Sequence, residues 1–129
     1  MALRVVRLGG PRAHDEGIRL GTVRRPPRGV PKAEYGRRNY YDVWFPTLAP
    51  SAELLTEGKN LTTEPRAWRA FARKYKKEMQ APEAARALDL LAALSHRTNL
   101  SVGCYCEDET RCHRSVLRQL LKARGTTFA

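Results

Sequence analysis

The chain has no long apolar run. None of its hydrophobic stretches approaches the roughly 20 residues that a membrane-spanning helix needs. The opening segment, MALRVVRLGG, places Arg4 and Arg7 inside a short apolar stretch, so it does not have the pattern of a secretory signal. We therefore expect a soluble, cytoplasmic protein without a membrane partner.

Cysteine is scarce and confined to one place. The chain has three cysteines, and all of them, Cys104, Cys106 and Cys112, fall in the segment CYCEDETRCHR at 104–114. A secreted domain held together by disulfides uses paired cysteines spread along the chain, so this class of protein is not expected here. Because the thiols are grouped, this segment is a candidate for a single site.

Acidic residues are also few. The chain has 24 Lys+Arg against 13 Asp+Glu, a formal net charge of +11, and the excess lies mainly in residues 1–38 and 66–78. Two basic blocks predict a positive face that attracts polyanions or anionic small ligands. A solvated surface without such a partner remains the plain alternative.

The order of residue types predicts an α/β fold. Apolar and β-branched stretches indicate strands at 3–8, 18–24, 40–45 and 100–106. Helices are expected after Ser51 as N-cap, at 64–79, from 82 to about 95, and at 112–124. A length of 129 residues suits one unit. We therefore expect residues 1–129 to form a single compact, three-layer-like domain with a small, mostly parallel sheet flanked by helices.

The segment CYCEDETRCHR is expected to join the last strand to the last helix. Cys104 and Cys106 are two residues apart, so on a strand they point to the same side. Cys112 and His113 fall at the first turn of the following helix. The carboxyl edge of such a sheet is where ligands usually bind, so the segment is the best candidate for a site.

Three interpretations of this segment remain open. Cys104, Cys106, Cys112 and His113 have the ligand types of a zinc site, although their spacing along a strand and a helix is unusual for zinc. Alternatively, the helix start and Arg114 form an anion pocket that activates a cysteine as a nucleophile. The third interpretation is that these side chains are only packed in the core. The sequence identifies no cofactor.

A second candidate is the loop RRPPRGVPK at 24–32. Its prolines stiffen the backbone, and Arg25 and Arg28 on such a loop can hold a phosphate with little ordering cost. A solvated basic turn is the alternative. Asp42 and Trp44, in YYDVWF, offer a carboxylate and an aromatic wall, without a spacing argument that ties them to the site.

Segments along nearly the whole chain resemble one known family. TVRRPPRGVPK, YDVWFPTLAPS, WRAFARKYKKEM and GCYCEDETRCHR occur in the order found in the domain of unknown function 488 family, DUF488. The resemblance implies a small bacterial α/β protein whose biochemical role is not established. Members of another branch of the family have the histidine position without these cysteines, so the resemblance favours His113 and the loop around Arg28 as shared site residues.

The sequence therefore predicts an α/β domain that binds an anionic ligand, a nucleotide or a phosphorylated metabolite. His113 is expected to titrate near neutrality and to act as acid or base. A basic nucleic-acid-binding domain and a structural zinc site are the alternatives, and the oligomeric state is not predicted. The candidate catalytic residues are His113, Cys106 and Cys112, and the candidate ligand-binding residues are Arg25, Arg28, Arg114, Asp42 and Trp44.

Overall fold

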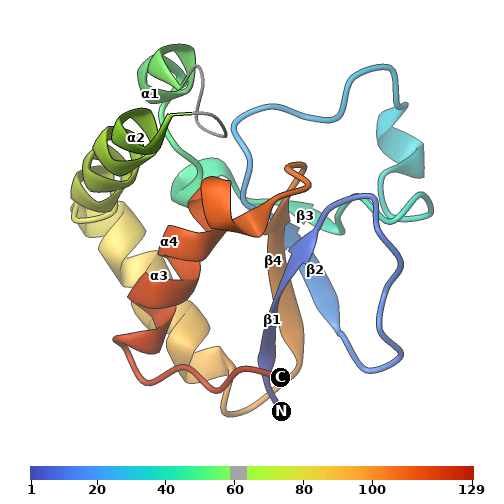
Figure 1. The fold of residues 1–129 in the computed structure, drawn as a ribbon. Coiled ribbons are helices and arrows are strands. Elements are labelled where there is room, and N and C mark those ends of the chain that lie inside the picture. Colours follow the sequence, from blue (N-terminus) through green and yellow to red (C-terminus); the bar gives the residue numbers. More distant parts are fainter. Residues whose placement is uncertain (59–63) are drawn as a thin grey trace.

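The computed structural model describes residues 1–58 and 64–129. Figure 1 shows an α/β fold built on one sheet. The strands are β1 (Leu3–Arg7), β2 (Ile18–Gly21), β3 (Val43–Trp44) and β4 (Leu100–Cys104). The helices are α1 (Ala52–Glu57), α2 (Pro65–Glu78), α3 (Pro82–Leu94) and α4 (His113–Lys122), with short 3-10 turns at Lys32–Glu34, Pro46–Leu48 and Glu109–Arg111. No helix in the described part of the chain has the length and apolar character to cross a bilayer.

The sheet is parallel throughout, in the order β1-β4-β2-β3. β4 lies between β1 and β2, and all five of its residues are buried, as expected for a central parallel strand. Leu100 at its start pairs with Leu3 on one side and with Ile18 on the other. Because all strands run the same way, the segments that follow β1, β2 and β4 meet at one edge of the sheet.

The four helices gather on one side of the sheet (Figure 1). Their apolar faces and the sheet enclose the main core, which includes Leu88 of α3, Leu117 of α4 and Val102 of β4. Phe71 and Tyr75 lie on the buried face of α2, as their spacing in the sequence predicts. The Tyr75 hydroxyl donates to the Leu48 carbonyl at 2.6 Å, which fixes α2 against the turn before α1.

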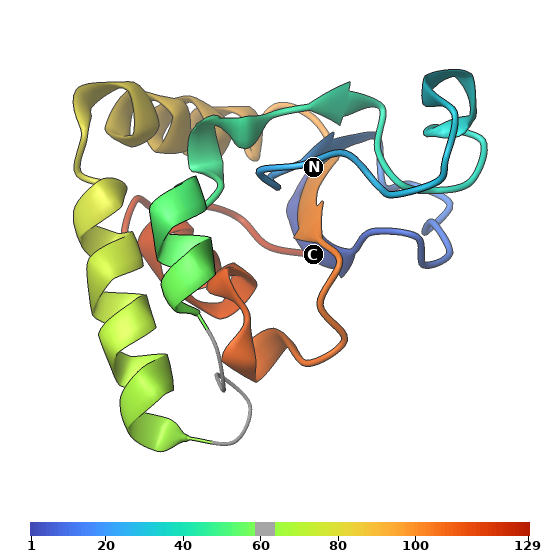
Figure 2. The ribbon, with the colours of Figure 1, turned by 90° about the horizontal axis from the view of Figure 1, so that it is seen from above.

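Long connections cover the opposite side of the sheet (Figures 1 and 2). Under them lies a smaller apolar cluster with Leu8, Val23 and Tyr41. Tyr41 packs directly on Gly21, where a Cβ atom would come within 2.3 Å of the ring. The third layer of the domain thus consists of loops, and the helices flank one face of the sheet.

A buried ion pair holds these loops to the sheet. Arg19 of β2 is fully buried, and its Nε and Nη2 donate to the two carboxylate oxygens of Glu16 at 2.7 and 2.9 Å. Ser101 of β4 donates to the same carboxylate at 2.6 Å. The remaining guanidinium hydrogens go to backbone carbonyls of both loops, including those of Gly10 and Asn39.

The α/β class and the parallel sheet are confirmed, but the strands are shorter than predicted. β2 ends at Gly21 instead of 24, and β4 ends at Cys104 instead of 106. Only Val43–Trp44 of the aromatic segment 40–45 is a strand, at the exposed edge of the sheet. Ser51 caps α1 as predicted, with its Oγ accepting from the Leu54 amide at 3.1 Å.

Candidate functional site

The candidate site lies at the carboxyl edge of the sheet, where β4 ends. β4 ends at Cys104, and the chain then turns through Tyr105 and Cys106 toward α4. Asp108 stabilises this turn, because its carboxylate accepts from the amide and the hydroxyl of Thr110 at 3.0 and 2.6 Å. The turn brings the end of the strand and the start of the helix together, as the sequence predicts.

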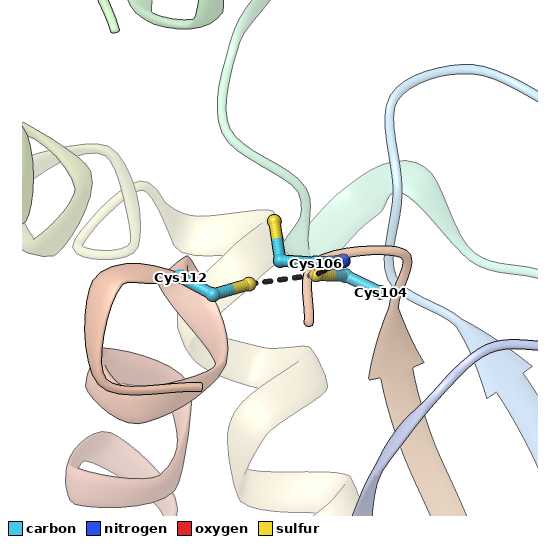
Figure 3. A group of neighbouring side chains, drawn as sticks. All are labelled: Cys104, Cys106 and Cys112. Carbon is cyan, nitrogen blue, oxygen red and sulfur yellow. Dashed lines mark hydrogen bonds between the residues drawn. The ribbon is translucent and has the colours of Figure 1, made fainter. Parts of the chain in front are cut away.

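The turn assembles the three thiols into one group, the cysteine cluster of Cys104, Cys106 and Cys112. Their sulfur atoms all lie within 4.8 Å of one another. The sulfurs of Cys104 and Cys112 face each other at 2.6 Å, whereas the Cys106 sulfur points away from the line that joins them (Figure 3). Cys104 and Cys112 are buried and Cys106 is exposed. Because β4 ends before Cys106, the turn and not a shared strand face makes the thiols converge.

The three thiols differ in acidity. The pKa of Cys106 lies below the usual range of a thiol, because the neighbouring Cys104 and Cys112 thiols and the positive charge of Arg114 favour its thiolate. The same interactions raise the pKa of Cys104, and burial raises it further. The pKa of Cys112 is also raised. The cluster thus combines one exposed cysteine with a lowered pKa and two buried cysteines with raised pKa values.

His113 is held inside the protein by its backbone neighbours. It is buried, and its Nε2 lies 2.8 Å from the Thr22 carbonyl oxygen, so Nε2 carries the proton and Nδ1 is the free acceptor. Nδ1 lies 3.7 Å from the Cys112 sulfur. Burial lowers the pKa of His113 to about 4. The expectation that this ring titrates near neutrality is therefore wrong, because the sequence does not show how completely the ring is buried.

Arg114 is a buried cation at the cysteine cluster. Arg114 is 3% exposed and donates to the Cys106 carbonyl, and the neighbouring Cys112 sulfur favours its charged form, which raises its pKa. Its Nε is buried without a hydrogen-bond partner. Among the described residues, no carboxylate lies within ion-pair distance of it. Arg114 therefore faces the sulfur atoms and is not open to a ligand in solution.

A pocket of about 670 Å³, here called the arginine pocket, opens beside the cysteine cluster at the same edge of the sheet. The segments after β1, β2 and β4 all contribute to it. Its functional side chains are Arg7, Arg25, Arg28, Tyr40 and Tyr105. Arg7 pairs with Glu107 at 3.4 Å, whereas Arg25 and Arg28 form no ion pair within the part of the chain that the structure describes. The pocket therefore offers two free guanidinium groups beside aromatic rings.

A smaller pocket of about 300 Å³, the inner pocket, lies between the loop after β2 and α1. Its lining includes Arg24, Cys104 and His113. Arg25 and Tyr105 line both pockets and separate them, and the Tyr105 hydroxyl donates to the Arg25 carbonyl at 2.8 Å. The two pockets are thus neighbours with one shared wall.

The structure brings together some of the predicted site residues and separates others. Arg25 and Arg28 share the arginine pocket, while Cys106, Cys112, His113 and Arg114 gather at the cluster beside it. Asp42 and Trp44 line neither pocket. Asp42 forms a bidentate ion pair with Arg12 at 2.9 Å, and the indole Nε1 of Trp44 donates to the Val23 carbonyl at 2.8 Å.

Sequence reasoning missed Arg7, Tyr40 and Tyr105 as pocket residues. Arg7 was placed in a strand, Tyr40 at the start of another and Tyr105 between two cysteines. A usable signal was present, since Arg7 and Tyr105 each fall near the carboxyl end of a predicted strand. Tyr40 comes from a long connection, and no local pattern predicts where such a segment folds back.

The chain was compared with families, with curated proteins and with solved structures. A family model described as DUF488-N3a, active DUF488-N3 subclade, matches residues 3–125. This range includes the strands and helices of the described residues, both pockets and the cysteine cluster. The comparisons with curated proteins and with solved structures gave no match.

Proposed function

The chain belongs to the DUF488 family, and we propose that it binds a nucleotide or a phosphorylated metabolite in the arginine pocket. One observation carries the proposal. Arg25 and Arg28 stand at the carboxyl edge of a parallel sheet without a carboxylate partner among the described residues. Guanidinium groups in this state are suited to phosphate, which they bind through paired N–H donors.

The shape and lining of the pocket favour a phosphate ester that also carries an aromatic group, such as a nucleotide, over free phosphate. A volume of about 670 Å³ lies in the range of sites for small organic ligands. The rings of Tyr40 and Tyr105 lie edge to face with their centroids 6.2 Å apart, and both border the pocket. A base can pack against these rings while its phosphate meets the arginines. Pro26 and Pro27 stiffen the loop that presents both arginines, which lowers the ordering cost of binding.

Chemistry on the bound ligand is a second part of the proposal. The family model is described as an active subclade, which favours an enzyme over a binding module. The groups that can supply reactivity beside the pocket are those of the cysteine cluster, next to Tyr105. Of the predicted catalytic residues only Cys106 is exposed, and the buried Cys112 and His113 act on a ligand only through their neighbours.

Calorimetric titration with adenosine monophosphate, adenosine triphosphate and inorganic phosphate tests the binding. Arg28→Ala should weaken nucleotide binding by roughly 10-fold to 100-fold, the cost of losing a charge-assisted hydrogen bond. Tyr40→Ala should weaken nucleotide binding and leave phosphate binding unchanged. Arg86→Ala, which removes an equal charge from the exposed side of α3, is the matched control. Equal affinities of Arg28→Ala and Arg86→Ala, or no binding of any of these ligands, would contradict the proposal.

A second candidate function, nucleic-acid binding, is favoured by a groove between α2 and the start of α4. Arg69, Arg73, Lys76 and Lys77 line this groove of about 910 Å³, and none of them forms an ion pair with another described residue. Such a row of cations suits a phosphate backbone. Fluorescence anisotropy with single-stranded RNA and DNA should then show affinity that falls steeply between about 50 and about 200 mM salt. Unchanged affinity in the double variant Arg73→Ala/Lys76→Ala would exclude the groove.

A further inference from the structure

We propose that Cys104, Cys106 and Cys112 bind one Zn²⁺ ion, with a fourth coordination position open toward the inner pocket. Cysteine sulfur is the preferred ligand of zinc in proteins, and a set of three is a known zinc-binding combination. The proposal concerns the cysteine cluster alone, so it stands or falls independently of ligand binding in the arginine pocket.

The placement of the three sulfurs is the first argument. Cys104 ends β4, Cys112 caps the start of α4 and Cys106 lies in the turn between them, and the three sulfurs lie within 4.8 Å of one another. In a tetrahedral zinc site with Zn–S bonds of about 2.3 Å, two sulfurs are about 3.8 Å apart. Cys106 would move closer by rotation of its exposed side chain (Figure 3), and the sulfurs of Cys104 and Cys112 would move apart from 2.6 Å. Side-chain rotation supplies shifts of this size without a change of fold.

The charge of Arg114 is the second argument, and it is independent of the first. A guanidinium group buried to this degree is costly unless an anion balances it. No carboxylate does so among the described residues, and Nε has no hydrogen-bond partner. Three thiolates and one Zn²⁺ carry a net charge of −1, and this charge would lie near the Arg114 guanidinium, which donates to the Cys106 carbonyl.

Hydrogen bonds around the cluster are the third argument. The Cys106 amide donates to the Cys104 sulfur at 3.4 Å, and this kind of bond stabilises a metal-bound thiolate. His113 is fixed beside the cluster by the hydrogen bond from its Nε2 to the Thr22 carbonyl. However, the convergent group contains the three cysteines without His113, so the Cys₃His set considered from the sequence is reduced to Cys₃.

An open coordination position is typical of a catalytic zinc site. Structural zinc sites are closed by four protein ligands, whereas catalytic sites keep a position for water or substrate. Cys104 and His113 both line the inner pocket, so a water or a ligand atom in this pocket can reach the metal. The Nδ1 of His113 lies 3.7 Å from the Cys112 sulfur, so a proton acceptor would stand close to the ligand set.

Metal analysis of the full chain, purified without chelator and under reducing conditions, tests the proposal. We expect one zinc per chain, and in the metal-depleted protein Co²⁺ should produce a thiolate-to-cobalt charge-transfer band. Cys106→Ser should lower the Zn²⁺ affinity by roughly 100-fold or more, beyond the 10-fold to 100-fold typical of lost second-shell partners. Glu107→Gln, which removes the adjacent exposed carboxylate, should leave the affinity unchanged.

Three results would overturn the proposal. The first is wild-type protein with well under one zinc per chain and no cobalt–thiolate band. The second is equal metal affinity in Cys106→Ser and wild type. The third is a count of one free thiol in metal-depleted protein that was purified and denatured without a reductant, since this count would mean that two of the three cysteines are joined as a disulfide. Circular dichroism of Cys106→Ser establishes that a lost affinity is not a lost fold, and the exposed position of Cys106 favours a folded variant.

Discussion

Glu16 and Arg19 form an ion pair that is almost completely hidden from solvent, with 2% and 0% of their side chains exposed. Arg19 donates hydrogen bonds to Glu16 and to backbone carbonyls of the loops after β1 and β2. The pair therefore joins β2 to both loops that cover it. Removing one partner of a buried pair leaves the other as an unpaired buried charge. Breaking such a pair typically costs about 3–5 kcal/mol.

We predict that Glu16→Gln lowers the free energy of unfolding by about 3 kcal/mol or more, because Arg19 keeps its charge and loses its partner. Urea unfolding at neutral pH measures the difference. Glu57→Gln is the matched control, since Glu57 pairs with Lys74 at 2.8 Å while both side chains are more than half exposed. The control should change stability by about 1 kcal/mol or less. Similar losses in the two variants would mean that burial does not strengthen the Glu16 pair.

The Glu16 carboxylate also predicts how the stability of the protein changes at low pH. Burial alone would raise the pKa of Glu16, but hydrogen bonds from Arg19 and Ser101 lower it from 4.5 to about 2. A lowered pKa contributes stability that is fully present above pH 4.5 and is lost as the pH falls toward 2. The free energy of unfolding of the wild type should therefore drop across this window more steeply than that of Glu16→Gln. Parallel curves for the two proteins would assign the acid loss to other groups.

Single residues were the hardest feature to predict from the sequence. The cysteine cluster was found because its members are close in the chain and its turn is short. Arg19 was placed in a strand, with nothing to indicate that it is buried, because its carboxylate partner comes from a loop. The burial of His113 and of Arg114 likewise depends on how α4 packs on β4, which residue spacing does not fix.

At the scale of elements, α1 depends on its cap more than the longer helices do. It has six residues, and helices this short are not stable without tertiary contacts and capping. The Ser51 hydroxyl accepts from the Leu54 amide and donates to the Glu78 carboxylate, so one side chain links the start of α1 to the end of α2. α1 also forms a wall of the inner pocket through Ala52, Leu55 and Thr56.

We predict that Ser51→Ala destabilises the protein by about 1–2 kcal/mol, because an N-cap and a link between two helices are lost together. Thermal and urea unfolding measure the loss. Thr56→Ala, which removes an exposed hydroxyl that bonds back to the Ala52 carbonyl, should stay within about 0.5 kcal/mol of wild type. If the two variants are equally stable, the cap is not what holds α1.

The helices were easier to predict than the strands. Proline at the first turn of α2 and α3 and an apolar stripe on each helix fixed both within a residue or two. Strand ends have no comparable marker, and their limits depend on the length of the neighbour. β3 pairs with Leu20 and Gly21 at the end of β2, so the short partner limits this strand to two residues of the aromatic segment.

At the scale of the whole molecule, the net charge of +11 acts against compactness. Like charges repel one another across the folded surface, and salt screens this repulsion. The Debye length falls from about 30 Å at 0.01 M to about 8 Å at 0.15 M ionic strength. The buried Glu16–Arg19 pair lies out of reach of the ions, so screening removes mainly the unfavourable surface term.

We predict that sodium chloride raises the thermal unfolding midpoint between about 0.01 and 0.15 M. Chloride is preferred to sulfate or phosphate, which are expected to bind in the arginine pocket and stabilise the fold by another route. Arg86→Glu lowers the net charge from +11 to +9 and should show a smaller rise. A midpoint that falls with salt would mean that attractive ion pairs dominate the surface.

Tyr105 separates the arginine pocket from the inner pocket, and its hydroxyl is anchored to the Arg25 carbonyl. A ligand in either pocket can therefore contact a side chain that also lines the other. Thermodynamic linkage requires the effect to be reciprocal: if an occupant of the inner pocket changes nucleotide affinity by some factor, nucleotide changes the affinity of that occupant by the same factor. The two sites would then communicate through the orientation of a single phenol ring.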